Sequence, residues 1–433
     1  MLSIIGLITT AIVVILLMGK RFSPIIALTI IPFLAAIVAG FEMSEIANFY
    51  ESGITKVMGV AVMFIFAILY FGIMQDVGLF TPLIRKMLQI TGSNPVAITC
   101  GTVIIAAIAH VDGSGASTFL ITIPALLPLY KKMKMNPYLL LLLVGTSASI
   151  VNMIPWGGPM GRSAIILEVD PTDLWRPLIP LQFVALLLLL ALAFFLGLKE
   201  KKRIHKLEEN IDTEHDDFNQ DQLEEKEDHP TVKPIWVNLL LTLAVIAMLF
   251  WGIIPAGFTF MIGVGLALVL NFPQKKLQMN RLKHHAPNAL VMATIILAAG
   301  SFLGILNGSG MLDSIATDMV NVLPEAIIPE LHLIVGALGV PLELVLSTDA
   351  TYFALYPIIE QIVTGYGVDA TVAIYLMMIG NIIGTFISPF SPALWLALGL
   401  SGLEIGKHIR YSFLWIWGFS LALIAAAFLI GIV

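Results

Sequence analysis

Long apolar segments alternate with short polar ones along nearly the whole chain. The apolar runs of the first half cover residues 2–19, 23–40, 57–75, 95–130, 139–155 and 178–198, and a second series follows position 234. Most runs come near the ~20 residues that a helix needs to cross a bilayer. The pattern predicts an all-α integral membrane protein and excludes an outer-membrane barrel, whose strands are short and alternating.

The amino-acid composition supports a membrane protein and argues against several other classes of protein. Of 433 residues, 58% are hydrophobic and 12% are charged. The net charge of −6 is spread over short loops, so no basic patch for nucleic acid is expected. The single Cys100 excludes an internal disulfide and a cysteine-based metal cluster. The first apolar run lacks a basic start and a small-residue cleavage site, so we expect a retained helix, not a signal peptide.

Basic residues predict the orientation. They cluster at 20–21, 85–86, 131–134, 199–203, 275–276, 281–283 and 407–410, positions that the positive-inside rule places in the cytoplasm. Both termini should then lie outside. Residues 95–130 and 329–364 must each enter and leave on the same side, as re-entrant hairpins that turn at Asp112-Gly-Ser-Gly and Ser347-Thr-Asp. We expect about ten spanning helices plus two hairpins, in the cell (inner) membrane.

The second half repeats the first at offsets between 231 and 237 residues. The matches pair Gly72 with Gly304, Gly78 with Gly310, Gln75 with Asn307, Asp112 with Asp349, and Pro159 with Pro392. Residues 1–198 form one predicted repeat, with hairpin 95–130 and a broken helix over 139–168. Residues 234–433 form the other, with hairpin 329–364 and a broken helix over 371–399. Each has an odd number of crossings, so the repeats should be inverted, as in secondary transporters. The polar residues 199–233 between them are predicted to be a cytoplasmic linker.

Glycines, prolines and polar side chains interrupt the apolar runs of the hairpins and broken helices. Unwound chain exposes N–H groups to an anion and oxygens to a cation. The predicted substrate-binding residues of the first half are Ser114, Gly115, Ser117, Thr118, Asn152, Gly157, Gly158 and Arg162. Those of the second half are Ser347, Thr348, Thr351, Asn381, Ser388 and Ser391. The plainer alternative is small-residue helix packing.

Ionisable residues inside the apolar runs are the candidates for ion coupling, because a charge in the membrane is costly and usually functional. Asp112 and Asp349 are predicted to carry the coupling ion, with turn capping as the alternative. Arg162 could hold a substrate carboxylate or anchor a helix at the interface. His110 could relay protons or make a structural hydrogen bond. Glu343 could be an ion ligand or simply face water.

Four segments carry a family resemblance. They are residues 69–80 (Leu-Tyr-Phe-Gly-Ile-Met-Gln-Asp-Val-Gly-Leu-Phe), Asp112-Gly-Ser-Gly, Leu127-Pro-Leu-Tyr and Pro155-Trp-Gly-Gly-Pro-Met-Gly-Arg. The chain resembles the citrate–metal–proton symporter family of the ion transporter superfamily. The resemblance implies proton-driven uptake of citrate complexed with Mg or Ca, by a homodimer whose transport domain moves like an elevator against a scaffold of the first three helices of each half. The family hairpin commonly reads Asp-Gly-Asp-Gly-Thr-Thr-Thr, and Ser114 stands here in place of the second acid, so a metal-free carboxylate is also considered.

The predicted function is a secondary active symporter of citrate or a related organic carboxylate, coupled to protons and working by alternating access. The alternatives are a sodium-coupled dicarboxylate carrier, an efflux carrier of the same superfamily, and a passive channel. An enzyme is not expected, because the chain has no His-Glu-x-x-His or Gly-x-Ser-x-Gly motif. No cofactor is predicted besides a divalent metal that travels with the substrate.

Overall fold

The computed structural model describes residues 1–18, 22–79, 82, 94–208, 235–252 and 254–433, and those residues form helices and connections without a strand. The first half contains α1 (Leu2–Met18), α2 (Pro24–Val38), α3 (Met43–Asp76), α5 (Pro95–Ala109), α6 (Gly115–Lys132), α7 (Pro137–Val151), α8 (Gly158–Leu167) and α9 (Pro171–Glu208). The second half contains α10 (Ile235–Trp251), α11 (Ala256–Asn271), α12 (Lys275–Gly308), α13 (Met311–Val322), η1 (Ile328–Glu330), α14 (Leu331–Ala337), α15 (Gly339–Glu343), α16 (Thr348–Ala350), η2 (Thr351–Leu355), α17 (Tyr356–Thr364), α18 (Ala370–Ile382), α19 (Pro392–Ser401) and α20 (Ile405–Ile430). The predicted all-α class is confirmed.

Local sequence sets where several helices begin. The side chain of Asn94 accepts a hydrogen bond from Val96 N at 3.0 Å, and Pro95 is the first residue of α5. Asn136 and Pro137 start α7 in the same way. An Asn cap satisfies one unpaired N–H group, and proline at the first position has no N–H to leave unpaired. These starts are therefore encoded within a few residues.

Two groups of helices form hairpins, and two further helices are interrupted. We call α5 with α6 hairpin 1, and α14 to α17 hairpin 2. Between α7 and α8, residues 152–157 are non-helical, and we call them the first break. Residues 383–391, between α18 and α19, are the second break. The ring of Pro155 would clash with the carbonyl four residues earlier, that of Val151, so it explains why α7 stops there. Pro389 keeps the residue before it out of a helix, but it lies beyond the reach of Ile382 and does not by itself explain the end of α18.

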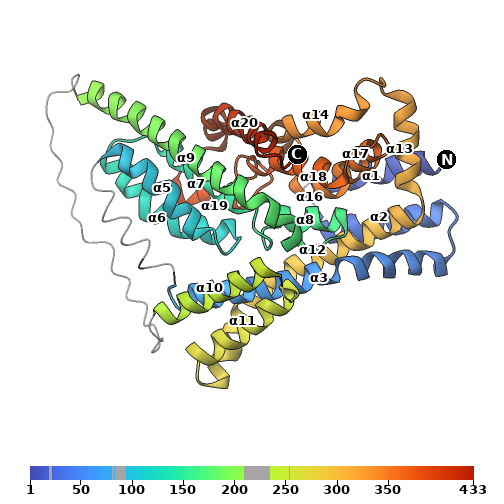
Figure 1. Ribbon diagram of the computed structural model, residues 1–433, viewed down its shortest axis with the longest axis horizontal. Coiled ribbons are helices and arrows are strands. Elements are labelled where there is room, and N and C mark those ends of the chain that lie inside the picture. Colours follow the sequence, from blue (N-terminus) through green and yellow to red (C-terminus); the bar gives the residue numbers. More distant parts are fainter. Residues whose placement is uncertain (19–21, 80–81, 83–93, 209–234, 253) are drawn as a thin grey trace.

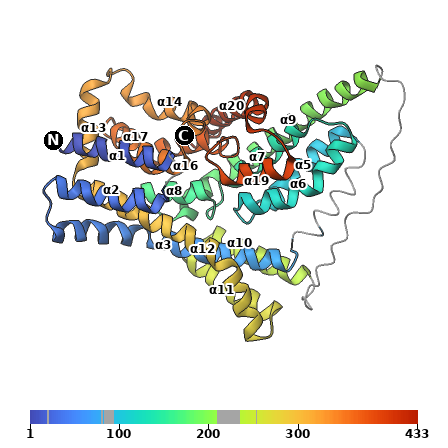
Figure 2. The same cartoon turned by 180° about the vertical axis from the view of Figure 1, so that it is seen from behind.

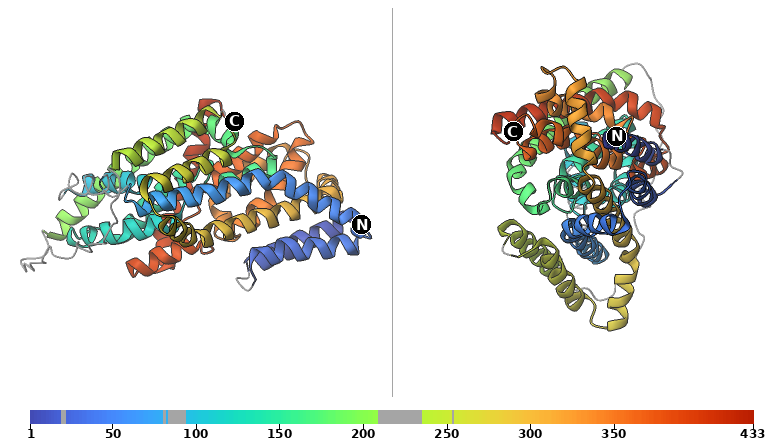
Figure 3. Two further views of the ribbon diagram at one scale, coloured as in Figure 1. Left: turned by 90° about the horizontal axis from the view of Figure 1, so that it is seen from below. Right: turned by 90° about the vertical axis from the view of Figure 1, so that its right-hand side faces the viewer.

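The helices form two layers (Figures 1 and 2). One layer holds α2, α3, α10, α11 and α12, and the other holds the hairpins, the broken helices, α9 and α20. At one end of the molecule α1 and α13 pack on each other, and α1 also contacts α2 and α16. The most extensive helix pair is α3 with α12, which run side by side (Figure 3).

The α3–α12 crossing depends on glycine. A Cβ atom on Gly53 would lie 2.1 Å from Gly300 O and 2.8 Å from Gly304 Cα. At the other end of the pair, Gly72 contacts the ring of His285. An early residue of α3 thus meets a late residue of α12, so the two helices are antiparallel. This is the relation that inverted halves would give, and the division into two repeats stays a prediction.

The described helices suit a membrane. Four of them, α3, α9, α12 and α20, are long and apolar enough to cross one, and the other apolar helices are shorter. Large apolar side chains face outward along them, as lipid contact requires, for example Phe183, Leu187 and Leu414. If α7 with α8, and α18 with α19, are each counted as one broken helix, the described residues contain ten apolar helices in addition to the two hairpins and α13.

Two features differ from expectation. The predicted linker 199–233 starts too early, because residues 199–208 continue α9 as helix. Glu200 is buried there and accepts hydrogen bonds from Asn136 N at 2.6 Å and from Arg203, which ties this turn to α7. The rest of the linker lies outside the described residues. The short helix α13 was not expected, because it is too polar to appear as an apolar run.

Candidate functional site

The tip of hairpin 1 is held by its own polar groups. Asp112 accepts from Ser114 N at 2.8 Å and from the Ser117 hydroxyl, and Ser114 caps α6. Gly113 has φ +72°, and a Cβ atom there would lie 3.0 Å from Trp156 O in the first break. Trp156 in turn donates from Nε1 to the carbonyl of residue 111 at 2.8 Å. The tip therefore lies against the first break.

His110 joins the same two elements from inside. Its ring is buried, with Nδ1 2.7 Å from Thr118 Oγ1 and Nε2 2.9 Å from Asn152 Oδ1. Because Asn152 Oδ1 can only accept, Nε2 carries the hydrogen of the neutral ring, and Nδ1 accepts from the Thr118 hydroxyl, which also lies 2.8 Å from Ser114 O. Both ring nitrogens are thus occupied within this network, which favours the structural role for His110.

The tip of hairpin 2 is held by α8. Arg162 donates from Nε at 2.9 Å and from Nη2 at 2.6 Å to the same oxygen of Asp349, Oδ1. The two side chains are 14% and 17% exposed, and the guanidinium lies 5.8 Å from the ring centre of Phe353. Arg162 thus neutralises Asp349 in this conformation. The two predicted ion carriers, Asp112 and Asp349, have separate partners among the described residues.

Glu343 was not chosen from the sequence, and it is not at a water-facing position. Its side chain is fully buried at the end of α15. Thr348 Oγ1 donates to Oε2 at 3.4 Å, and Ser388 Oγ donates to the backbone carbonyl of Glu343 at 2.7 Å. Oε1 has no hydrogen-bond partner among the described residues. The signal that could have found it is a carboxylate inside the apolar run 329–364.

Most other predicted binding side chains are used to hold the hairpins and breaks. Ser347 caps α16, Thr351 donates to Ser347 O, and Asn381 donates weakly to Gly339 O at 3.4 Å. Gly157 has no space for a side chain, since a Cβ atom would lie 2.1 Å from Asn152 O. In this conformation these groups contact other parts of the protein, so their main role is to hold the hairpins and breaks in place.

Two helix N-termini in this region have no side-chain cap. α8 starts at Gly158 with Gly157 before it, and α19 starts after Ser391, whose side chain makes no capping bond. The tip of hairpin 1 lies near both, because Gly113 contacts Trp156 and Gly115 contacts Phe386 and Ala393. Uncapped N-termini present N–H groups and partial positive charge to an anion.

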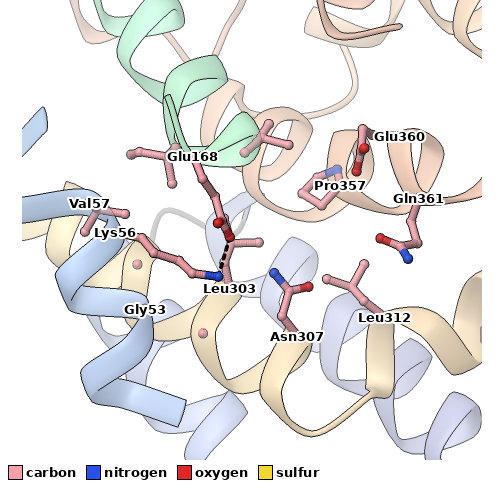
Figure 4. A pocket seen from close by; sticks show the side chains of 14 residues that line it. Gly53, Lys56, Val57, Glu168, Leu303, Asn307, Leu312, Pro357, Glu360 and Gln361 are labelled. Carbon is pink, nitrogen blue, oxygen red and sulfur yellow. Dashed lines mark hydrogen bonds and ion pairs between the residues drawn. The ribbon is translucent and has the colours of Figure 1, made fainter. Parts of the chain in front are cut away.

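A cavity of about 210 Å³ lies between the two layers, lined by parts of α3, α8, α12, α13 and α17 (Figure 4). Lys56 on α3 and Glu168 after α8 meet at one side of it, with Nζ 2.6 Å from Oε1. Asn307, Glu360 and Gln361 line it too (Figure 4). None of the predicted site residues does. Beside Arg162, a second crevice is too narrow for water, so the space next to this guanidinium has no room for a substrate in this conformation.

One group could hold a metal ion by its geometry. Asp76, His284 and His285 place ligand atoms within 4.8 Å of one another where α3 ends beside α12. Asp76 is already bonded to His285 Nε2 at 2.9 Å and lies 3.4 Å from Arg281. Arg281 would repel a metal cation at this position. The interactions of Asp76 with His285 and Arg281 instead join the end of α3 to α12.

The chain is similar to known transporters over its full length. A family model described as citrate transporter matches residues 1–384. Two proteins of Bacillus subtilis (strain 168) match end to end: "Citrate transporter" is 36% identical over 435 residues, with 100% of both chains covered. "Mg(2+)/citrate complex secondary transporter" is 35% identical over 431 residues, with 100% of this chain and 99% of that one covered.

A solved structure shares the fold. The YdaH transporter of Alcanivorax borkumensis, described as having an unusual topology, aligns with a TM-score of 0.54 over 90% of this chain and 89% of its own, at 13% identity. At that identity the likeness concerns the fold alone. The relatives and the family are transporters, so the prediction of a transporter and not an enzyme is confirmed.

Proposed function

Because the chain belongs to the citrate transporter family, we propose that it is a secondary symporter that takes up citrate as a complex with Mg²⁺ or Ca²⁺, driven by protons. The observation that carries the proposal is the end-to-end match, at 35% identity, with the Mg(2+)/citrate complex secondary transporter. The chain spans a membrane several times, and the cell membrane is the proposed location.

The charges near the hairpins support a metal complex over free citrate. Arg162 is the one Lys or Arg in the hairpin and broken-helix ranges 95–130, 137–168, 331–364 and 370–401, and it is paired with Asp349. Fully ionised citrate carries three negative charges, which such a site balances poorly. A bound divalent metal leaves one net negative charge, which two helix N-termini suit better. The metal is therefore carried mainly by citrate oxygens, and the protein need not supply several carboxylates.

We place the substrate between the uncapped starts of α8 and α19, beside the tip of hairpin 1. The N–H groups of both helix starts would hold carboxylate oxygens, with the Ser391 hydroxyl as a further donor. Arg162 would orient a carboxylate once the tip of hairpin 2 moves and Asp349 releases it. Asp112 and Asp349 were predicted to carry the coupling ion; the pairing of Asp349 with Arg162 gives that carboxylate a different partner in this conformation.

Movement of one layer past the other would give alternating access. The layer of α3 and α12 would be the scaffold, and the layer with the hairpins would be the moving domain. The two layers meet at α8, where Gly161 contacts Phe64, and at the cavity of Figure 4. A homodimer, a cytoplasmic linker and outside termini complete the proposal. The N-terminus lies at the opposite end of the molecule from the last residues of α9 and the first residues of α10 (Figure 1), which supports placing it on the other side of the membrane from them.

The test is uptake of radiolabelled citrate into proteoliposomes under an imposed inward proton gradient, with empty liposomes as the blank. We expect accumulation that needs Mg²⁺ or Ca²⁺ and collapses when a protonophore is added. Accumulation without metal would refute the complex as substrate, and accumulation driven by a sodium gradient alone would refute proton coupling. Citrate flux that depends on neither the proton gradient nor the sodium gradient would indicate a channel.

A matched pair of variants tests the placement at α19. Ser391→Asp and Ser391→Asn both supply a side-chain cap, but only Asp adds negative charge at the helix start. Charge at this position is worth about 1 kcal/mol, or a factor of about 5 in the KM for citrate. We expect KM to be higher for Ser391→Asp than for Ser391→Asn by that factor, and equal values would remove the substrate from this helix start.

A further inference from the structure

Hairpin 2 and the second break enclose a group of buried polar atoms that lack partners. Glu343 Oε1, Asn381 Oδ1 and the Tyr352 hydroxyl are each buried without a hydrogen bond among the described residues. All three side chains are 0% exposed. Buried polar atoms are nearly always hydrogen-bonded, so three unpaired polar atoms in one region need an explanation.

The three side chains that carry these unpaired atoms lie in the same region, around the Glu343 carboxyl. The Asn381 side chain lies beside the Glu343 carboxyl, and Tyr352 lies within electrostatic range of it. The titratable and charged groups that face Glu343 from the surrounding elements are Arg162, Tyr352 and Tyr356. Of these, Arg162 carries charge, and it makes its two short hydrogen bonds to Asp349.

An ionised Glu343 is poorly supported by this environment. By distance the carboxyl has one donor, Thr348 Oγ1 at a long 3.4 Å, with the side chains of Asn381 and Ser388 beside it, and the neighbouring cation Arg162 is already paired with Asp349. A buried carboxylate without a cation or several short hydrogen bonds is strongly disfavoured relative to its neutral form. A proton on the carboxyl removes the charge and gives the group an O–H donor, for which the Asn381 amide oxygen is an acceptor in need of one.

The packing favours a proton over a metal cation as the occupant. A Cβ atom on Gly384 would lie 3.2 Å from Glu343 Cβ, and one on Gly339 would lie 2.4 Å from Asn381 N. The two cavities described above are lined by other residues. Sodium would need space for several oxygen ligands around it, whereas a proton needs none.

We propose that Glu343 carries the coupling proton, held in the closed site between hairpin 2 and the second break. The inference rests on the proposed symport and assigns the proton to Glu343 in place of Asp349. Thr348, at the hairpin tip, and Ser388, in the break, both bind Glu343. Closing hairpin 2 therefore requires a neutral Glu343, and opening it to water allows the proton to leave. Proton binding and closure of the hairpin are thereby linked.

The transport experiment compares wild type with Glu343→Gln, which keeps the shape of a protonated carboxyl. The control is Glu330→Gln, which changes an exposed glutamate directly before hairpin 2. An inward gradient of one pH unit should drive about tenfold accumulation per coupled proton in wild type and in Glu330→Gln. Glu343→Gln should lose accumulation and keep citrate exchange between equal concentrations. Undiminished proton-driven accumulation in Glu343→Gln would overturn the assignment.

A measurement on purified protein separates this inference from the proposed function. Infrared spectra should show a protonated-carboxyl band in wild type that is missing in Glu343→Gln and kept in Glu330→Gln. If wild type transports no citrate but the band behaves this way, the proposed function fails and the proton on Glu343 stands. If the band is unchanged in Glu343→Gln, Glu343 is not the carrier. Should Glu343→Gln not fold, Glu343→Asp replaces it, and the band should then shift in position; an unmoved band would again overturn the assignment.

Discussion

The ion pair between Arg162 and Asp349 joins α8 to the tip of hairpin 2 across 187 positions of sequence. Both side chains are more than four-fifths buried, and both hydrogen bonds reach one oxygen. Removing one partner of a buried pair leaves an uncompensated charge, which costs about 3 kcal/mol. For 433 residues the entropy of unfolding is about 0.9 kcal/mol per degree, so each single variant should lower the Tm by about 3 °C.

The assay is thermal unfolding of the purified protein in detergent, followed by tryptophan fluorescence, for Arg162→Gln, Asp349→Asn and the double variant. The double variant removes both charges, so we expect its Tm within about 1 °C of wild type. Lys407→Gln, in the exposed pair of Lys407 and Glu404, serves as the control and should not shift the Tm. A double variant that is as unstable as the two single losses combined would refute the reasoning, because it would show no coupling between the two charges.

Three further predictions concern the crossing of α3 and α12, the movement of the two layers, and the tip of hairpin 1. Gly53→Ala should lower the Tm, because its Cβ atom would meet the backbone of α12 at 2.1 Å, whereas Gly59→Ala on the same helix has open space and should not lower it; equal effects would contradict the crossing. Cysteines at Lys56 and Glu168, joined by a bifunctional reagent beside the cavity, should block citrate uptake, while each single cysteine treated alike should leave it intact; uptake by the joined pair would argue against movement of the layers. Trp156→Phe loses one buried hydrogen bond and should cost about 1 kcal/mol in thermal unfolding, and an unchanged Tm would mean that this bond does not hold the tip of hairpin 1.

The sequence alone determined the features that depend on neighbouring residues. Apolar run length predicts the membrane helices, and a cap followed by proline, as at Asn94 and Asn136, marks where helices start. Proline and glycine in 152–157 mark the first break. These signals act within about one helical turn, because a cap satisfies N–H groups only two or three residues away. The turns of both hairpins could be placed for the same reason.

The tertiary structure decided which distant side chains meet. The sequence offered Arg162 and Asp349 as separate site residues, and only the packing of α8 on hairpin 2 pairs them. It left Glu343 undecided between water and an ion, and only the contact with the second break buries it. It also assigned Glu200 to a solvated linker, although this side chain accepts a hydrogen bond from Asn136 N at the start of α7. Such pairings depend on the rotation and relative height of helices far apart in the chain, and the apolar pattern that places each helix in the membrane does not specify either one.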